Sequence, residues 1–251
     1  MRFKDKVAIV TGAGRNIGES LSKLFADDGA KVAVVDMDEM RGKRTADAVN
    51  KAHQGAAIYI KADVSDENSV KGMVDATVKA FGKIDVLVNN VAISDNKNIR
   101  ECTLADFNKT IAVTLTSQFL CSKYVAEQMI AQGKGGAIVN IGSTSGFQGR
   151  GSAVAYAAAK GGVANLMRAL AVQLAPYKIR VNSIVPNKIG SPVGRDEFDP
   201  DRPVPNLVGR AGTPDELARA VLFMASDDAA FVVGENLVVD GGLMAMMTGG
   251  G

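Results

Sequence analysis

The sequence predicts an α/β fold in which helices cover both faces of one parallel β-sheet of about seven strands. Short apolar runs rich in β-branched residues alternate with longer segments of helical periodicity. Several of these runs are continuously apolar, as strands are when both of their faces are buried. Crossovers between parallel strands are right-handed, so this alternation predicts a doubly wound sheet.

Seven segments have the composition of such strands. They are residues 6–11, 31–36, 56–64, 84–90, 136–142, 179–185 and 236–242. Apolar residues between the first two recur at helical spacing, namely Ile17, Leu21, Leu24 and Phe25. No linker interrupts the series, and 251 residues is an acceptable length for one α/β unit. Residues 1–251 are therefore expected to form a single domain.

The charge and hydropathy of the sequence argue against several kinds of binding partner. The net charge is +2 and no basic block is present, which argues against nucleic acid. The first residues are too charged for a signal peptide, and no apolar stretch approaches the ~20 residues that span a bilayer. A cytoplasmic protein without a membrane partner is expected. His53 is the one histidine, so no histidine metal site is expected, and Cys102 and Cys121 are predicted to be buried thiols.

The segment from residue 189 to residue 216 departs from the regular alternation. It contains five of the seven prolines. Long irregular segments in compact domains are usually functional or mobile. We expect a lid over a substrate site at about residues 190–210, with a plain surface loop as the alternative.

The first apolar run leads into a glycine-rich loop, TGAGRNIG, at residues 11–18. The GxGxxG dinucleotide pattern does not fit, because Gly18 comes one residue late. The variant TGxxxGxG fits if Asn16 replaces its middle glycine, and asparagine tolerates positive φ. Its amide could also donate to a phosphate oxygen, beside the positive end of a helix that begins at about Ile17. A pyrophosphate site is predicted at Gly12, Arg15, Asn16, Ile17 and Gly18, with a tight strand–helix turn as the alternative.

Acidic and polar residues follow the next strands. Asp36 ends the second strand, close to the position of the ribose ligand in a Rossmann unit. A carboxylate there accepts from the adenosine 2′-OH and repels a 2′-phosphate, which favours NAD over NADP. A helix cap is the alternative, although Asp38 could fill that role. Asp63 and Val64 are expected beside the adenine, and Asn90 follows the fourth strand at the same sheet edge.

A second group of residues carries reactive side chains. Tyr156 and Lys160 in YAAAK share one helix face, and an ammonium group near a tyrosine lowers the pKa of its phenol. Ser143 follows the fifth strand closely enough to meet that helix. Together with the glycine loop, these residues predict one catalytic set. A serine hydrolase is excluded because the centre of GSTSG is Thr144, not serine.

This ordered set resembles the short-chain dehydrogenase/reductase superfamily in its compact one-domain form. The resemblance covers nearly the whole chain and includes TGAGRNIG, DV, NNVA, Ser143, YAAAK, VNSIVPNKI and ASDDAAFVVGENLVVDGG. It implies hydride transfer between a nicotinamide cofactor and an alcohol or carbonyl carbon. It further implies that Tyr156 is the general acid/base, that Ser143 holds the substrate oxygen, and that Lys160 binds the nicotinamide ribose and tunes Tyr156. Ile189 would contact the nicotinamide carboxamide.

Four positions depart from the family pattern. Val91-Ala92 stands where Ala-Gly is usual, and Asn187 follows Pro186 where glycine is usual. Thr114 replaces an asparagine thought to shape its helix so that a backbone carbonyl holds a proton-relay water near the lysine. A threonine hydroxyl can also bond back to a helical carbonyl. The sequence therefore does not decide whether the proton relay is kept.

The first functional hypothesis is an NAD-dependent oxidoreductase of a small or medium, largely apolar secondary alcohol or ketone. Its expected pocket residues are Ile93, Ser145, Phe147, Asn187 and Val193. Arg150 could hold a substrate anion, or it could be solvated. The alternatives are an NADPH-dependent reductase of 3-oxoacyl thioesters on acyl carrier protein and a dinucleotide-binding regulator with impaired catalysis.

The resemblance also implies an assembly. Two predicted helices, at about residues 114–131 and 154–174, carry small residues that permit close helix approach. The implied assembly is a homotetramer with closed two-fold symmetry.

Overall fold

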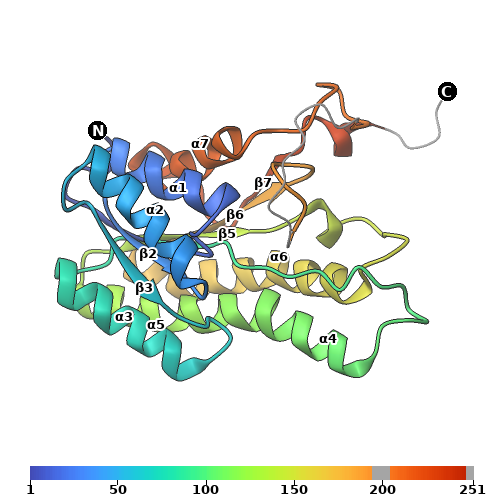
Figure 1. The fold of residues 1–251 in the computed structure, drawn as a ribbon, viewed down its shortest axis with the longest axis horizontal. Coiled ribbons are helices and arrows are strands. Elements are labelled where there is room, and N and C mark those ends of the chain that lie inside the picture. Colours follow the sequence, from blue (N-terminus) through green and yellow to red (C-terminus); the bar gives the residue numbers. More distant parts are fainter. Residues whose placement is uncertain (194–203, 247–251) are drawn as a thin grey trace.

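The computed structural model of the chain describes residues 1–193 and 204–246 (Figure 1). Its centre is a seven-stranded sheet in the order β3-β2-β1-β4-β5-β6-β7, in which every neighbouring pair is parallel. The strands are β1 (Val7–Thr11), β2 (Lys31–Asp36), β3 (Ala57–Lys61), β4 (Val86–Asn89), β5 (Gly136–Ile141), β6 (Ile179–Pro186) and β7 (Asn236–Val239). The predicted doubly wound parallel sheet is confirmed.

Helices cover both faces of the sheet, as Figure 1 shows. One face carries α1 (Asn16–Asp27), α2 (Glu39–Ala52) and α7 (Pro214–Ala225). The other carries α3 (Glu67–Phe81), α4 (Leu104–Ile111), α5 (Ser117–Gln132) and α6 (Val154–Leu174). The strand order reverses between β1 and β4, and such a switch point opens a crevice at the carboxyl ends of the strands.

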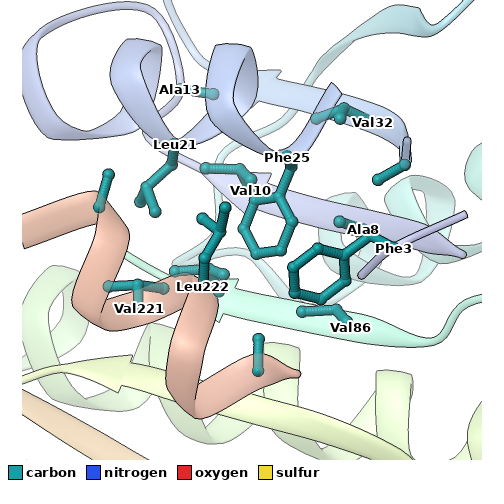
Figure 2. Close-up of a cluster of buried hydrophobic side chains, with 14 of the residues drawn as sticks. Phe3, Ala8, Val10, Ala13, Leu21, Phe25, Val32, Val86, Val221 and Leu222 are labelled. Atoms are coloured by element: carbon teal, nitrogen blue, oxygen red, sulfur yellow. The ribbon is translucent and has the colours of Figure 1, made fainter. Parts of the chain in front are cut away.

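A separate hydrophobic core lies against each face of the sheet. Ala8 and Val10 of β1 belong to one core, and Ile9 between them belongs to the other. Figure 2 shows the first core, where the rings of Phe3 and Phe25 meet edge to face with their centroids 4.8 Å apart. A one-residue slip would exchange the two faces, so this alternation specifies the strand register.

The helix boundaries match the predicted ones except at the start of α5. The helix predicted at 154–174 is α6, and the helix predicted from about Ile17 begins at Asn16. The helix predicted at 114–131 instead begins as a π-helical turn, Ala112–Thr116, which leads into α5. A Cβ on Gly162 of α6 would lie 2.7 Å from Leu115 Cδ2, so this turn packs directly on the backbone of α6.

The predicted lid at about 190–210 includes residues 194–203, which lie outside the described part of the chain. The two flanks of the segment are held together. Ile189 and Gly212 form a parallel bridge. The Gly190 N–H donates to Gly212 O at 2.8 Å, and the Gly212 N–H donates to Lys188 O at 3.0 Å. The base of the segment is therefore anchored beside the end of β6.

The histidine and cysteines have structural surroundings. His53 is the C-cap residue of α2, and its Nε2 lies 2.7 Å from Asp27 Oδ1. Cys121 is buried as predicted, and burial raises the pKa of its thiol to about 12. Cys102 is half-buried, not buried, and neither cysteine is in a disulfide. Over residues 1–193 and 204–246, no helix is long and apolar enough to cross a membrane, and no group of three or more His, Cys, Asp or Glu could hold a metal ion.

Candidate active site

A cavity of about 1160 Å³ opens at the carboxyl ends of the strands. Pockets for one drug-sized ligand usually hold roughly 300–1,000 Å³, so this cavity has room for two ligands. The structure brings twelve of the predicted site residues to its wall: Gly12, Arg15, Asn16, Ile17, Asp36, Asp63, Val64, Asn90, Ser143, Tyr156, Lys160 and Ile189.

Gly18 is the predicted site residue that does not line the cavity. It is buried in α1, and a Cβ at this position would lie 2.1 Å from Gly12 O. The structure thus gives Gly18 a packing role, and its contact with a cofactor stays a prediction. Glycine is needed there because the first turn of α1 packs against the backbone of the loop.

Asn16 has a φ of 50°, which confirms the predicted positive φ. Its amide nitrogen donates to Ser191 Oγ at 2.7 Å and to Ser191 O at 3.3 Å. The amide thus holds Ser191 beside the glycine loop, whereas the sequence suggested that it could donate to a phosphate. Ser191 is buried and lines the cavity. The sequence missed it because its partner is distant along the chain.

The carboxylate of Asp36 closes the glycine loop against β2. Its Oδ2 accepts from the Gly14 N–H at 2.8 Å, and its Oδ1 accepts from the Asp38 N–H at 2.9 Å. The N-cap of α2 is Asp38, which accepts from the Arg41 N–H at 3.0 Å. The alternative that Asp36 caps this helix is therefore wrong. Arg41 lines the same cavity as Arg15 and was not predicted.

The loop end of the cavity has the chemistry that a dinucleotide requires. The N-terminus of α1 has no side-chain cap, so its first N–H groups and positive dipole end suit a pyrophosphate. Asn90 braces this loop, since its amide nitrogen donates to Thr11 O at 3.0 Å and to Gly12 O at 3.1 Å. With the Asp36 carboxylate at the end of β2, these groups fit an adenosine diphosphate moiety.

Three predicted catalytic residues meet at the other end of the cavity. Ser143 follows β5, and the α6 residues Tyr156 and Lys160 are 6% and 1% exposed. The Ser143 side chain lies close enough to the Tyr156 phenol to lower its pKa. Lys160 Nζ donates to Ile141 O at 2.6 Å and lies 5.6 Å from the centroid of the Tyr156 ring. The structure therefore brings a serine hydroxyl, a phenol and an amine together.

Burial dominates the acid–base properties of this group. It raises the pKa of Tyr156, while the hydrogen bond with Ser143 and the charge of Arg150 act in the opposite direction without overcoming it. The two groups that lower the pKa of Tyr156 are thus Ser143 and Arg150, whereas the sequence indicated Lys160. Burial lowers the pKa of Lys160 itself to about 7, so its ammonium form is disfavoured.

The start of α6 is held by a residue that the sequence reading missed. The N-cap residue Ala153 has a φ of 62° and no side chain able to cap. The carboxylate of Asp95 takes that role, accepting from the Ala155 N–H at 3.4 Å and the Tyr156 N–H at 3.2 Å. Lys97 O accepts from the Val154 N–H at 3.2 Å. No local capping signal could reveal this, because Asp95 precedes Ala155 by 60 residues.

Thr114 connects the π-helical turn to the segment after β4. Its buried Oγ1 accepts from the Ile93 N–H at 3.1 Å and donates to Ile93 O at 3.0 Å. The Thr114 hydroxyl therefore donates to another segment, whereas the sequence suggested that it could bond back to its own helix. The hydroxyl fixes the cavity wall at Ile93 against the π turn.

Most of the expected pocket residues line the cavity. They are Ile93, Ser145, Asn187 and Val193, together with Arg150. Phe147 does not line it and is 41% exposed, so that prediction is wrong. The Asn187 amide nitrogen donates to Thr144 Oγ1 at 2.6 Å. Asparagine at this family glycine position thus links the end of β6 to the segment that follows β5.

Comparison with known proteins agrees with this geometry. Residues 12–244 match a family model described as enoyl-(acyl carrier protein) reductase. Cis-4-hydroxycyclohexanecarboxylate dehydrogenase of Sinomonas cyclohexanicum is 39% identical, over 97% of this chain and 98% of that protein. Cyclopentanol dehydrogenase of Comamonas sp. is 37% identical, over 97% and 99% of the two chains.

A solved structure gives the same result. A chain described as a short-chain dehydrogenase/reductase from Burkholderia xenovorans superposes with a TM-score of 0.89 at 37% identity. The match covers 98% of this chain and 99% of the other. Fold, site and sequence relatives therefore agree: the chain belongs to the short-chain dehydrogenase/reductase superfamily, a family of oxidoreductases that bind nicotinamide dinucleotides.

Proposed function

We propose that this protein is an NAD-dependent oxidoreductase that interconverts a secondary alcohol and a ketone. The observation that carries the proposal is the meeting of Ser143, Tyr156 and Lys160 in the cavity that also contains the glycine loop and Asp36. Two relatives support this proposal, since their names give cis-4-hydroxycyclohexanecarboxylate and cyclopentanol as substrates. Both compounds are secondary alcohols on a ring.

The cofactor contacts follow from the positions of the cavity residues. Asp36 would accept a hydrogen bond from the adenosine ribose, and the N-terminus of α1 would hold the pyrophosphate. Lys160 would hydrogen-bond the nicotinamide ribose, and Ile189 would contact the carboxamide. When bound, the nicotinamide ring supplies or accepts the hydride.

The serine and tyrosine would act on the substrate oxygen. Ser143 and Tyr156 both line the cavity and lie close together, so a substrate oxygen beside both hydroxyls could receive a hydrogen bond from each. In ketone reduction, the Tyr156 hydroxyl would give its proton to this oxygen as negative charge develops there. In alcohol oxidation, the tyrosinate would take that proton back. Ser143 would hold the oxygen in place.

The arrangement around the site belongs to the same proposal. Residues 1–251 would form one domain, and the segment at about 190–210 would act as a lid anchored by the Ile189–Gly212 bridge. The protein would work in the cytoplasm as a homotetramer. Light scattering at micromolar concentration tests the assembly, and a monomeric mass would contradict it.

A cofactor-by-substrate screen tests the activity. Aliphatic, cyclic and aryl secondary alcohols would be offered with NAD and with NADP, and absorbance at the nicotinamide band would report turnover. We expect oxidation of secondary alcohols with NAD. Turnover of 3-oxoacyl thioesters with NADPH alone would favour the thioester reductase, and dinucleotide binding without any turnover would favour the regulator.

A further inference from the structure

Arg150 presents a positive charge to the substrate end of the cavity. It lines the cavity, and its Nη1 donates to Ser145 Oγ at 3.2 Å. Within the described residues no carboxylate pairs with it. A guanidinium has five N–H donors in a rigid fork, so most of its donors are not used by the bond to Ser145.

The position of Arg150 relative to the reacting oxygen follows from Ser145. Ser143 and Ser145 are both 8% exposed and two residues apart, which places their Cα atoms at most ~7 Å from each other. The charge of Arg150 also acts on the phenol of Tyr156. The guanidinium is therefore close to the hydroxyls of Ser143 and Tyr156 without being bonded to them.

The surroundings of Arg150 favour an anionic ligand group beside it over a neutral one. Lys160 is buried and donates to Ile141 O, so it is not oriented to balance an anion beside Ser145. Ile93 and Val193 also line the cavity and supply apolar wall. A ligand that is apolar in its middle, with an alcohol at one end and an anion at the other, complements this arrangement.

We propose that Arg150 binds a carboxylate of the substrate, so that the substrates are secondary alcohols or ketones carrying a carboxylate one ring or a short chain away from the reacting carbon. This inference rests on the proposed function. Arginine suits the task because its fork can donate two parallel hydrogen bonds to a carboxylate. The neutral pocket expected from the sequence would instead select alcohols without regard to charge.

The first test compares two substrates that differ in charge. We expect kcat/KM for 4-hydroxycyclohexanecarboxylate to exceed that for its methyl ester by at least ~10-fold, the scale of one hydrogen bond to a charged group. Arg150→Gln should lower this ratio by about tenfold, and Arg150→Lys should restore part of it because it keeps the charge without the fork. A ratio cancels changes common to both substrates.

The control is Arg168→Gln, which removes an exposed arginine on α6 outside the cavity. It should leave the ratio unchanged. Added salt should raise KM for the carboxylate in the wild type and not for the ester, because salt screens the ion pair. An Arg150→Gln variant with the wild-type ratio would overturn the proposal.

The second test needs no turnover. Cyclohexanecarboxylate and cyclohexanecarboxamide lack the alcohol, and their binding can be titrated by saturation-transfer NMR. The carboxylate should bind Arg150→Gln about tenfold more weakly than the wild type, with little change for the amide. Equal carboxylate binding by the two proteins would overturn the inference even if neutral alcohols are oxidised. Selective carboxylate binding without oxidation of any alcohol would instead overturn the proposed function and support the inference.

Discussion

The carboxylate of Asp95 accepts a hydrogen bond from the backbone N–H of Tyr156 at 3.2 Å. This contact joins the segment after β4 to the first turn of the helix that carries both Tyr156 and Lys160. Because the N-cap residue Ala153 has a left-handed conformation and no capping side chain, the helix start depends on Asp95. Asp95 does not line the cavity, so we assign it as a positioning residue for Tyr156.

Asp95→Ala is expected to lower kcat several-fold and to leave KM for NAD almost unchanged. Loss of a helix cap also costs about 1 kcal/mol of unfolding free energy. Asp95→Asn keeps an acceptor oxygen and should recover most of kcat. Steady-state kinetics at fixed alcohol concentration check the split between kcat and KM.

The matched control is Thr103→Ala. Thr103 caps α4 by accepting from the Asp106 N–H at 3.1 Å, and it does not line the cavity. It should cost similar stability without the fall in kcat. Equal losses of kcat in Asp95→Ala and Thr103→Ala would show that Asp95 contributes only to stability.

Tyr156→Phe should reduce kcat by ~10²–10⁴-fold, the usual scale for acid/base catalysis. Cofactor binding should change little, because the loop and Asp36 are untouched. Turnover rates and an NADH fluorescence titration measure the two quantities. Activity within a few-fold of the wild type would remove Tyr156 from the proton transfer.

The rate of alcohol oxidation should rise with pH, because the tyrosinate is the proton acceptor and burial raises the pKa of Tyr156 above its ordinary value. Below that pKa, each pH unit should raise kcat/KM about tenfold. The hydrogen bond from Ser143 lowers the pKa of Tyr156, so Ser143→Ala should move the rising limb to higher pH as well as reduce the rate. A limb that keeps its position in Ser143→Ala would show that another group titrates.

Lys160→Met should raise the free energy of unfolding above that of the wild type, and this increase should be larger at pH 7 than at pH 10. The ordinary lysine pKa of 10.5 applies to the unfolded chain, and burial lowers the pKa of Lys160 to about 7 in the folded protein. Between these values the unfolded chain binds a proton that the folded protein does not. Lowering the pH therefore destabilises the wild type through Lys160 by up to about 1.4 kcal/mol per unit.

Urea unfolding of both proteins at pH 7 and pH 10 measures this difference. The lost hydrogen bond to Ile141 O contributes at both pH values, so the change between them isolates the charge. A difference in unfolding free energy that does not depend on pH would contradict burial of an uncharged Lys160.

The fold was predictable because its signals are local. Continuous apolar runs predict buried parallel strands, and the observed alternation of Ala8, Ile9 and Val10 between two cores shows why these runs are apolar at every position. The positive φ of Asn16 was also predictable, from the few residue types that tolerate it. These features need no knowledge of distant contacts.

The errors in the site concern contacts between distant segments. Asn16 donates to Ser191, Thr114 bonds to Ile93, and Asp95 caps α6. Each of these partners is set by how elements pack, which periodicity does not report. The direction of the pKa shift of Tyr156 was missed for a related reason: the sequence shows the neighbouring Lys160 but not the depth at which both are buried.

Charges of opposite sign line the adenosine end of the cavity and favour different cofactors. Asp36 opposes a 2′-phosphate, whereas Arg15 and Arg41 line the same cavity and favour one. A carboxylate about 4 Å from a phosphate costs on the order of a few kcal/mol at an effective dielectric near 20. Asp36 is also held in place by the Gly14 and Asp38 N–H groups, while a long arginine side chain can turn toward water.

Wild-type kcat/KM is therefore expected to favour NAD over NADP by at least ~10-fold, which needs only part of that repulsion. Asp36→Ala should reduce or reverse the ratio as arginine pairs with the phosphate. Because Asp36→Ala also removes the acceptor for Gly14, Asp36→Asn serves as the matched variant: it keeps an acceptor oxygen and removes the charge. If both variants shift the NAD-to-NADP ratio, the charge of Asp36 sets the cofactor preference. If only Asp36→Ala shifts it, the conformation of the glycine loop sets the preference. Preference for NADP in the wild type, or an unchanged ratio in both variants, would show that other residues select the cofactor.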